Sequence, residues 1–283
     1  MNQNNCHKEI KLILLDLDGT LLTTDKKISA RNYAALEQAA AKGIYIVPCT
    51  GRFFAGIPED IRNLPFLHYA ITINGAEIYD ARADRSIHSA LISCQRAGEI
   101  FSALDSLPVI YDCFQDGWGW MDQTFYDQAD LYEMGEVLAV YIRKMRTPVE
   151  NFKQTIKERN RGVQKIQMFY RDMELHRRML QELKQWFPDL VVTTSLTNNI
   201  ELNSHDAHKG NALLELCRHL NIAPSETMAF GDGLNDLTML KTAGIGVAMG
   251  NAAQEVKDVA DFVTDTNDND GVAQSVMHFC FGE

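Results

Sequence analysis

Asp16-Leu17-Asp18-Gly19-Thr20 directly follows the apolar run Ile10-Lys11-Leu12-Ile13-Leu14-Leu15. Such a short run, rich in Leu and Ile, predicts a strand that is buried on both faces, as in a parallel sheet. The two carboxylates stand where the strand ends, and ligands of open α/β sheets bind at the carboxyl ends of the strands. Like charges held together cost energy unless a cation offsets them, and Mg²⁺, which prefers oxygen ligands, is the natural candidate. Asp-x-Asp-Gly is also a common turn after a strand, so this pattern alone leaves both interpretations open.

Length and composition indicate a globular protein of about two domains. The chain has 283 residues, of which 46% are apolar and 23% are charged. No apolar run approaches the ~20 residues of a membrane helix. The apolar residues near the N-terminus are too few for a signal peptide, and Asp16 and Asp18 interrupt them. We therefore expect a cytoplasmic protein that does not bind membranes.

The six cysteines are scattered and include no Cys-x-x-Cys pair: Cys6, Cys49, Cys94, Cys113, Cys217 and Cys280. This spacing argues against a disulfide framework and against a structural zinc site. Reduced, mostly buried thiols are expected instead.

Charge is distributed unevenly along the chain. The net charge of −11 disfavours non-specific binding to nucleic acid. Residues 143–184, here called the basic segment, carry 12 Lys and Arg against 5 Asp and Glu, so their balance is +7 and the remainder carries −18. The basic segment can form solvated helix faces. Alternatively, it can attract an anionic substrate toward a metal site.

The first 86 residues predict the start of a parallel α/β sheet. Ser29 is expected to be the N-cap of a helix, and the apolar run Ile44–Cys49 predicts a second strand before Thr50-Gly51-Arg52. This order of strand, helix and strand suits a right-handed parallel crossover. Asn74-Gly75 stands between two apolar runs and predicts a hairpin. The polar residues 81–86 break the apolar pattern, and we expect a domain boundary there.

The middle of the chain predicts a second α/β unit. Its expected elements are helices at 97–107 and 173–187, strands at 109–114 and 163–170, and a hairpin of 190–196 with 200–202. The first domain is then expected to resume with a helix that opens at Lys209-Gly210. Asn251 and Asp270-Gly271 are expected to begin later helices. Two strands are expected between the helix at Lys209 and the helix at Asn251, at 227–230 and 245–249, and a third is expected after Asn251, at 262–264.

Polar side chains thus stand at the ends of predicted strands or at a helix start, and each pattern is weak by itself. Their order is more specific: Asp16-Leu17-Asp18-Gly19-Thr20, Thr50-Gly51-Arg52, Lys209-Gly210 and Gly231-Asp232-Gly233-Leu234-Asn235-Asp236. With these four motifs, the sequence resembles the haloacid dehalogenase superfamily, in particular its Cof-type sugar phosphatase branch. The Ile73-Asn74-Gly75-Ala76 hairpin and Asp270-Gly271-Val272 are also typical of that branch, and the resemblance spans the whole chain.

The resemblance implies an α/β fold with a Rossmann-like, doubly wound parallel sheet as its core. A smaller α/β cap domain is implied to be inserted into this core. We expect residues 1–82 and 204–283 to form the core and residues 83–203 to form the cap. Such a cap would close over the substrate and exclude bulk water. A monomer or a weak homo-oligomer is expected.

The resemblance also implies the roles of the acidic residues. Asp16 is implied to be the nucleophile that attacks phosphorus and forms an aspartyl-phosphate. Asp18 is implied to protonate the leaving oxygen and then to act as general base for water. The implied cofactor is Mg²⁺, held by the backbone carbonyl of Asp18 and the carboxylates of Asp16 and Asp232. Asp236 is implied either to reach this metal through water or to orient Lys209.

The phosphoryl group has its own implied donors. The Thr50 hydroxyl is implied to bind one of its oxygens, together with backbone N–H groups near Leu17 and Gly51. Lys209 is implied to supply a positive charge at the phosphoryl group. Asn235 is implied to contact the phosphate directly.

Three other groups of residues have both a functional and a structural interpretation. Two resemble metal sites but suit polar loops better: a zinc-like set of His205, Asp206 and His208, and the calcium-loop-like residues 266–270, which lack the distal Glu of an EF-hand. The third is an aromatic set that could either stack on a sugar ring or pack in the cap: Trp118, Trp120 and Tyr126.

The leading hypothesis is a Mg²⁺-dependent phosphatase that acts on a small phosphorylated metabolite, a sugar phosphate above all. A phosphomutase with the same chemistry would need a second phosphate site, which the basic segment could provide. A non-catalytic sensor of sugar phosphates would not need Asp18. A phosphonate hydrolase would need a Schiff-base lysine, and none is identified in the cap. Nucleic-acid binding through the basic segment would be steeply salt-dependent and is disfavoured by the net charge.

Overall fold

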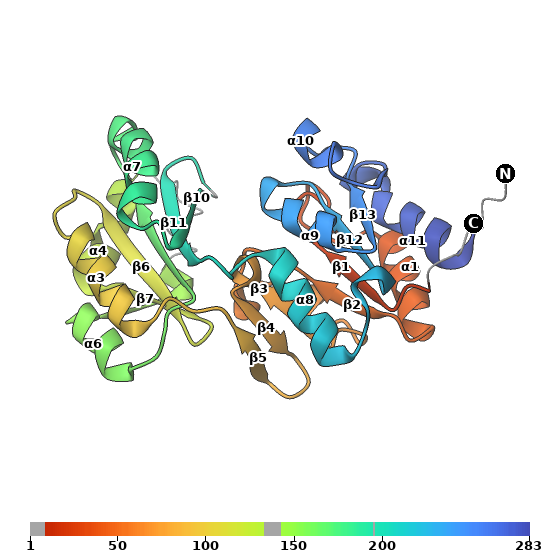
Figure 1. Ribbon diagram of the computed structural model, residues 1–283, viewed down its shortest axis with the longest axis horizontal. Helices are drawn as coiled ribbons and strands as arrows, with labels where there is room; N and C mark the ends of the chain where they lie inside the picture. The colour runs from red at the N-terminus through yellow and green to blue at the C-terminus, as the bar shows by residue number, and fades with distance from the viewer. Residues whose placement is uncertain (1–8, 133–142, 195) are drawn as a thin grey trace. The chain divides into compact units, whose positions relative to one another are not determined.

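The computed structural model describes residues 9–132, 143–194 and 196–283 (Figure 1). Contacts divide the chain into two compact units, Met1–His88 with His208–Glu283, and Ser89–Ala207. We call the first the core unit and the second the inserted unit. None of the described helices is long and apolar enough to cross a membrane.

The core unit is built on a five-stranded parallel sheet, which confirms the predicted fold class. From edge to edge its strands are β14 (Phe262–Val263), β13 (Ile245–Ala248), β12 (Thr227–Gly231), β1 (Leu12–Leu15) and β2 (Tyr45–Pro48). The chain adds β2 on one side of β1 and later adds β12 on the other side. This reversal makes the end of β1 a topological switch point, the place where open α/β sheets bind ligands.

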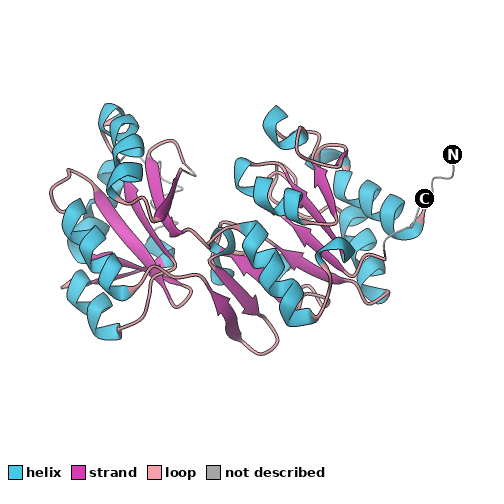
Figure 2. Ribbon diagram, viewed as in Figure 1, coloured by secondary structure: helices cyan, strands magenta, loops and turns pink. Residues whose placement is uncertain are grey.

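Helices cover both faces of this sheet, which explains why β1 is apolar throughout (Figure 2). Alternate side chains of a strand point to opposite faces. Ile13 and Leu15 therefore enter one apolar cluster, and Leu12 and Leu14 enter the other. The first cluster includes α1 (Ala30–Ala41) and α11 (Gly271–Phe281), and the second includes α8 (Lys209–Leu220), α9 (Leu237–Thr242) and α10 (Gln254–Lys257).

A three-stranded sheet lies beside β2 in the core unit, linked to it by the bridge between Cys49 and Ile71. The predicted hairpin at Asn74-Gly75 is confirmed, because it joins two antiparallel strands. Of the polar residues 81–86, where a domain boundary is expected, 81–84 form the turn before the third strand and 85–86 begin that strand. The division by contacts follows His88. The strands are β3 (Tyr69–Thr72), β4 (Glu77–Asp80) and β5 (Arg85–Ser89), and α2 (Glu59–Arg62) precedes them.

The inserted unit contains a six-stranded mixed sheet in the order β10-β11-β9-β6-β7-β8. Three helices pack on one face of it, namely α3 (Cys94–Leu104), α6 (Phe152–Arg159) and α7 (Met173–Trp186). The short helix α4 (Gln123–Gln128) follows β7. The strands are β6 (Ile110–Gln115), β7 (Trp118–Asp122), β8 (Arg146–Val149), β9 (Lys165–Phe169), β10 (Leu190–Thr193) and β11 (Asn199–Ser204).

Two predicted helix starts have different outcomes. Ser29 is the N-cap of α1, because its Oγ accepts a hydrogen bond at 3.0 Å from a backbone N–H of the first turn. The prediction for Asn251 is wrong, because the next helix, α10, begins only at Gln254 and Asn251 does not cap it. The Asn251 side chain instead donates to the carbonyl of Gly19 at 2.8 Å. A tertiary contact therefore replaces the local cap.

The cysteines behave as the sequence predicts. Five of them are free thiols, and three of these, Cys49, Cys113 and Cys217, are buried. Cys6 lies outside the described residues.

The basic segment is largely neutralised by ion pairs. Seven of its cations contact carboxylates: Arg143, Arg146, Lys153, Arg159, Arg161, Lys165 and Arg178. Most of the partners lie outside the segment. A charge balance that counts only the acids within the segment therefore overstates its net positive charge. The positive surface considered from the sequence is therefore much reduced, and so is the support for a second phosphate site.

The pair formed by Asp112 and Arg146 is fully buried in the inserted unit. Arg146 Nε donates to Asp112 Oδ2 at 2.8 Å, and Gln167 Nε2 donates to the same oxygen at 3.1 Å. Burial raises the pKa of Asp112, although the charge of Arg146 opposes it. Removing one member of such a pair leaves the other charge buried without compensation.

Replacing Arg146→Met should therefore destabilise the protein by about 3–5 kcal/mol, measured by urea unfolding. The double variant Arg146→Met, Asp112→Leu should recover most of this loss, because neither charge of this pair is then buried without its partner. Arg178→Met is the matched control, because its pair with Glu182 is exposed and such pairs contribute at most about 1 kcal/mol. Equal losses in Arg146→Met and the control would contradict the prediction.

Candidate active site

The register of the parallel sheet brings three of the predicted motifs to the carboxyl ends of its strands. Leu15 is paired with Phe230 of β12 on one side and with Pro48 of β2 on the other. The residues that follow each strand therefore emerge side by side. The first, second and fourth motifs all begin at these carboxyl ends, at Asp16, Thr50 and Gly231.

Lys209 occupies the centre of the site. It is the first residue of α8 and is fully buried. Its Nζ donates to Asp16 Oδ1 and to Asp236 Oδ1, each at 2.6 Å. Burial by itself would lower the pKa of Lys209, but the charges of the two carboxylates outweigh burial and raise it. Lys209 therefore remains an ammonium at neutral pH.

Asp232 completes a group of three carboxylates with Asp16 and Asp236. One oxygen of each lies within 4.8 Å of the others. Asp232 Oδ1 accepts a hydrogen bond from Thr20 Oγ1 at 2.9 Å. Three carboxylates face the one ammonium of Lys209 here, so negative charge remains in excess among the described residues. Clustered carboxylate oxygens of this kind fit a hard divalent cation such as Mg²⁺.

The protonation of Asp16 reflects this crowding. Burial raises the pKa of Asp16 to about 7, and Lys209 only partly opposes the effect. The negative charges of Asp236 and Asp232 add to it. The pKa of Asp232 is also raised, first by burial and then by Asp236. A cation bound between these groups would favour their ionised forms.

Asp18 lies in a different electrostatic environment, although it is two residues from Asp16. Arg52 binds its carboxylate with two hydrogen bonds, from Nε at 2.9 Å and from Nη2 at 3.0 Å. Lys26 Nζ adds a third hydrogen bond at 2.8 Å. Burial would raise the pKa of Asp18, but these hydrogen bonds hold it below its usual value. Asp18 is therefore ionised and outside the three-carboxylate group.

The predicted phosphate donors also lie in the core unit. The Thr50 hydroxyl oxygen accepts a hydrogen bond from Arg52 N at 3.2 Å. The hydroxyl donates no hydrogen bond within the described chain. The N–H groups of Leu17 and Gly51 likewise have no acceptor among the described residues. Buried N–H groups without partners are rare in folded proteins. They are thus available to a ligand.

Sequence reasoning missed four contributors to this site. Arg52 and Asn74 stand within predicted motifs, but the sequence assigns them no roles of their own; in the structure, Asn74 Oδ1 accepts a hydrogen bond from Asn235 Nδ2. Lys26 has no local signal, because a lysine in a polar loop is ordinary. Thr20 belongs to the first motif, but its hydrogen bond to Asp232 joins residues 212 positions apart. Only the folded chain brings such partners together.

The other candidate features have structural roles. His208 is the N-cap of α8, because its Nδ1 accepts a hydrogen bond at 3.0 Å from Asn211 N. In the described chain, the group of three carboxylates is the one cluster that could hold a metal, so the zinc-like and calcium-like patterns form none. Trp120 and Tyr126 pack against apolar clusters of the inserted unit.

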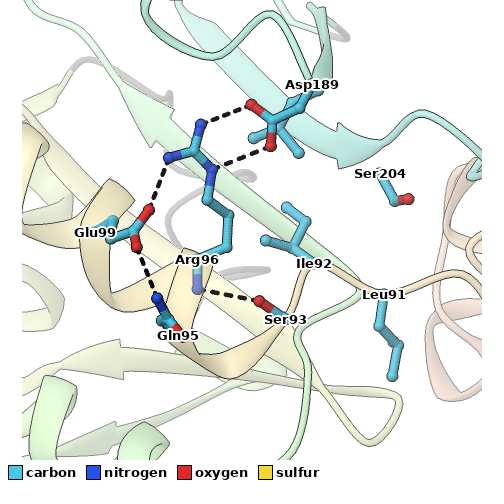
Figure 3. A pocket seen from close by; sticks show the side chains of 9 residues that line it. Leu91, Ile92, Ser93, Gln95, Arg96, Glu99, Asp189 and Ser204 are labelled. Atoms are coloured by element: carbon cyan, nitrogen blue, oxygen red, sulfur yellow. Dashed lines mark hydrogen bonds and ion pairs between the residues drawn. The ribbon is translucent and has the colours of Figure 1, made fainter.

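A cavity of about 410 Å³ lies in the inserted unit (Figure 3). Arg96 contributes its guanidinium to the lining, and Figure 3 shows it bound to Asp189 and to Glu99. The nearest contacts are 2.6 Å and 2.8 Å, respectively. Its charge is already balanced by carboxylates, and the lining includes none of the predicted site residues.

Comparison with known proteins identifies the family. A family model for haloacid dehalogenase-like hydrolases matches residues 13–276. The chain is 34% identical to phosphatase YwpJ of Bacillus subtilis (strain 168), with 95% of this chain and 99% of that protein covered. It is 32% identical to the 5-amino-6-(5-phospho-D-ribitylamino)uracil phosphatase YcsE of the same organism, with 96% of both covered. The solved structure of the HAD subclass IIB sugar phosphatase BT4131 matches with a TM-score of 0.76 at 25% identity, covering 95% of this chain and 98% of that one.

The matched range contains all four motifs and the whole inserted unit. The resemblance stated from the motifs is therefore confirmed. The chain belongs to the haloacid dehalogenase-like hydrolases, and it is a phosphatase of that family.

Proposed function

We propose that this phosphatase depends on Mg²⁺ and hydrolyses a small phosphorylated metabolite, a sugar phosphate, through an aspartyl-phosphate. One observation carries the proposal: the buried ammonium of Lys209 joins Asp16 to Asp236, and Asp232 completes a carboxylate group beside them. This arrangement holds one carboxylate against a positive charge at the carboxyl ends of the parallel strands, where open α/β sheets bind ligands.

In the first proposed step, a carboxylate oxygen of Asp16 attacks phosphorus. The new O–P bond forms as the bond to the leaving oxygen breaks, and Asp18 gives its proton to that oxygen. In the second step Asp18 takes a proton from water, the water oxygen bonds to phosphorus, and the bond to Asp16 breaks. Inorganic phosphate and free Asp16 are released.

We assign charge stabilisation to donor groups of the four motifs. Lys209 balances charge beside the nucleophile, while the Thr50 hydroxyl and the N–H groups of Leu17 and Gly51 donate to phosphoryl oxygens. Asn235 supplies a further amide donor. Because the two N–H groups have no acceptor among the described residues, they need not break existing bonds to bind the phosphate.

Asp16 and Asp232 would hold the Mg²⁺, together with the backbone carbonyl of Asp18. The ion would offset the repulsion between an anionic nucleophile and an anionic phosphate. Asp236 has another task in the described geometry, because one of its oxygens binds Lys209 and the other accepts the N–H groups of Asp232 and Gly233. We therefore assign to it the orientation of Lys209.

Asp18 must change partners during this cycle. Bound to Arg52 and Lys26 it is a carboxylate, the form that accepts a proton from water. Donating a proton to the leaving oxygen requires the protonated form. We therefore expect Asp18 to exchange these contacts for the leaving oxygen once substrate is bound.

The substrate class rests on the relatives. YcsE is named for a substrate with a 5-phospho-D-ribityl group, and BT4131 is named as a sugar phosphatase. Both names describe phosphate on a sugar or sugar-derived group. A panel of phosphorylated sugars, nucleotides and cofactors would rank the substrates.

Asp16→Asn should reduce phosphate release from this panel by at least about 1,000-fold, because an uncharged amide cannot replace the nucleophile. Release by the wild type should also disappear with EDTA. Asp258→Asn is the control, since Asp258 is exposed on the surface. Substantial release by Asp16→Asn, or none from the panel by folded, Mg²⁺-loaded wild type, would refute the proposal.

Mg²⁺ should raise the melting temperature of the wild type, because a ligand that binds only the folded state stabilises it by about 2.7 kcal/mol at 100 times its Kd. In Asp232→Asn this shift should be much smaller, and in Asp258→Asn it should be unchanged. Differential scanning fluorimetry at increasing MgCl₂ measures the effect. The metal assignment fails if all three proteins show the same shift.

Without metal, Asp16 should make stability depend on pH. Its pKa is about 7 in the folded protein instead of 3.8, so the folded state binds this proton more tightly. The contribution of Asp16 to stability therefore falls as pH rises from about 4 to about 7. In EDTA, the melting temperature of Asp16→Asn relative to wild type should increase over that range. A difference that stays constant or decreases with pH would contradict this assignment.

A further inference from the structure

The turn Ile73-Asn74-Gly75, which forms η2 between β3 and β4, has an unusual backbone. Its residues all have positive φ, of 51°, 57° and 100°. This region suits Gly and is tolerated by Asn, but it is costly for a β-branched residue such as Ile. Strained backbone persists where surrounding contacts hold it, and it gathers at functional sites.

Two backbone hydrogen bonds tie this turn to the second motif. The N–H of Ile73 donates to the carbonyl of Arg52 at 2.9 Å, and the N–H of Asn74 donates to the carbonyl of Thr50 at 3.0 Å. The turn thus holds both residues that flank Gly51. The conformation of the Gly51 N–H, a proposed phosphate donor, depends on it.

The same turn contacts the third motif. A Cβ on Gly75 would collide with the backbone carbonyl of His208 and would lie 2.9 Å from the nitrogen of Lys209. No larger residue fits at this position without moving the start of α8. The turn therefore also sets the place from which Lys209 reaches into the site.

The Asn74 side chain reaches the fourth motif. Its Oδ1 accepts a hydrogen bond from Asn235 Nδ2 at 3.2 Å. The same oxygen lies over Gly51, where a Cβ would come within 2.9 Å of it. Gly51 thus leaves room for the amide that binds Asn235. One turn therefore touches the three motifs that supply Thr50 and Gly51, Lys209, and Asn235.

We propose that Asn74 is a positioning residue for phosphate binding, an inference that rests on the proposed function. By accepting one N–H of the Asn235 amide, Asn74 holds that amide in a single orientation. The second N–H of the amide is then directed to a phosphoryl oxygen. Fixing the donor before the ligand arrives reduces the entropy lost on binding.

A double-mutant cycle tests this inference. Asn74→Gly removes the amide and keeps a residue that accepts positive φ, while Asn235→Ala removes the amide that Asn74 orients. Both kcat/KM for p-nitrophenyl phosphate and the calorimetric Kd of inorganic phosphate are measured with Mg²⁺ present. Asn74→Gly should weaken both about tenfold in the wild-type background and less than about twofold in Asn235→Ala.

Asn221→Gly is the matched control, because Asn221 has the same residue type and a similar φ of 54° but ends α8 away from the motifs. It should leave both quantities unchanged. Equal losses from Asn74→Gly in both backgrounds, or no loss, would overturn the inference. Phosphate binding needs no turnover, so binding without hydrolysis would refute the proposed function while the cycle still measures the coupling. A wild type that binds no phosphate would overturn the inference as well.

Discussion

The buried ammonium of Lys209 is the interaction on which the site depends. A charge removed from water is tolerated only when close partners replace its hydration, and here two carboxylates do so at 2.6 Å each. Asp16 arrives from the end of β1, Asp236 from the segment after β12, and Lys209 from the first turn of α8. The sheet and the helix must therefore be placed accurately. Their apolar contacts, in which Leu12 and Leu14 pack with α8, supply that accuracy.

The site places two carboxylates that are two residues apart in the chain in different electrostatic environments. Asp16 lies among other acids and has a raised pKa, whereas Asp18 is bound by Arg52 and Lys26 and has a lowered one. Environments that shift the pKa values of two acids in opposite directions indicate different roles in one reaction. The roles that we propose follow this division, with Asp16 as the nucleophile and Asp18 as the proton carrier.

Much of the fold could be predicted because its signals are local. The apolar runs around β1, β2 and β12, the Ser29 cap and the Asn74-Gly75 turn each depend on a few consecutive residues. Errors arose where distant partners compete with local preference. Asn251 binds Gly19 instead of capping a helix. The cations of the basic segment pair with acids outside it, which no count within the segment can reveal.

The sequence by itself determined the family, the order of the four motifs and the identity of the acids, because these follow from residue types at short spacings. Tertiary structure alone decided which groups meet. Lys209 and Asp16 are 193 positions apart, and Asn235 and Asn74 are 161 apart. Hydrogen bonds and ion pairs act over a few ångströms in space. Their partners are therefore set by strand register and helix packing, which no short stretch of sequence contains.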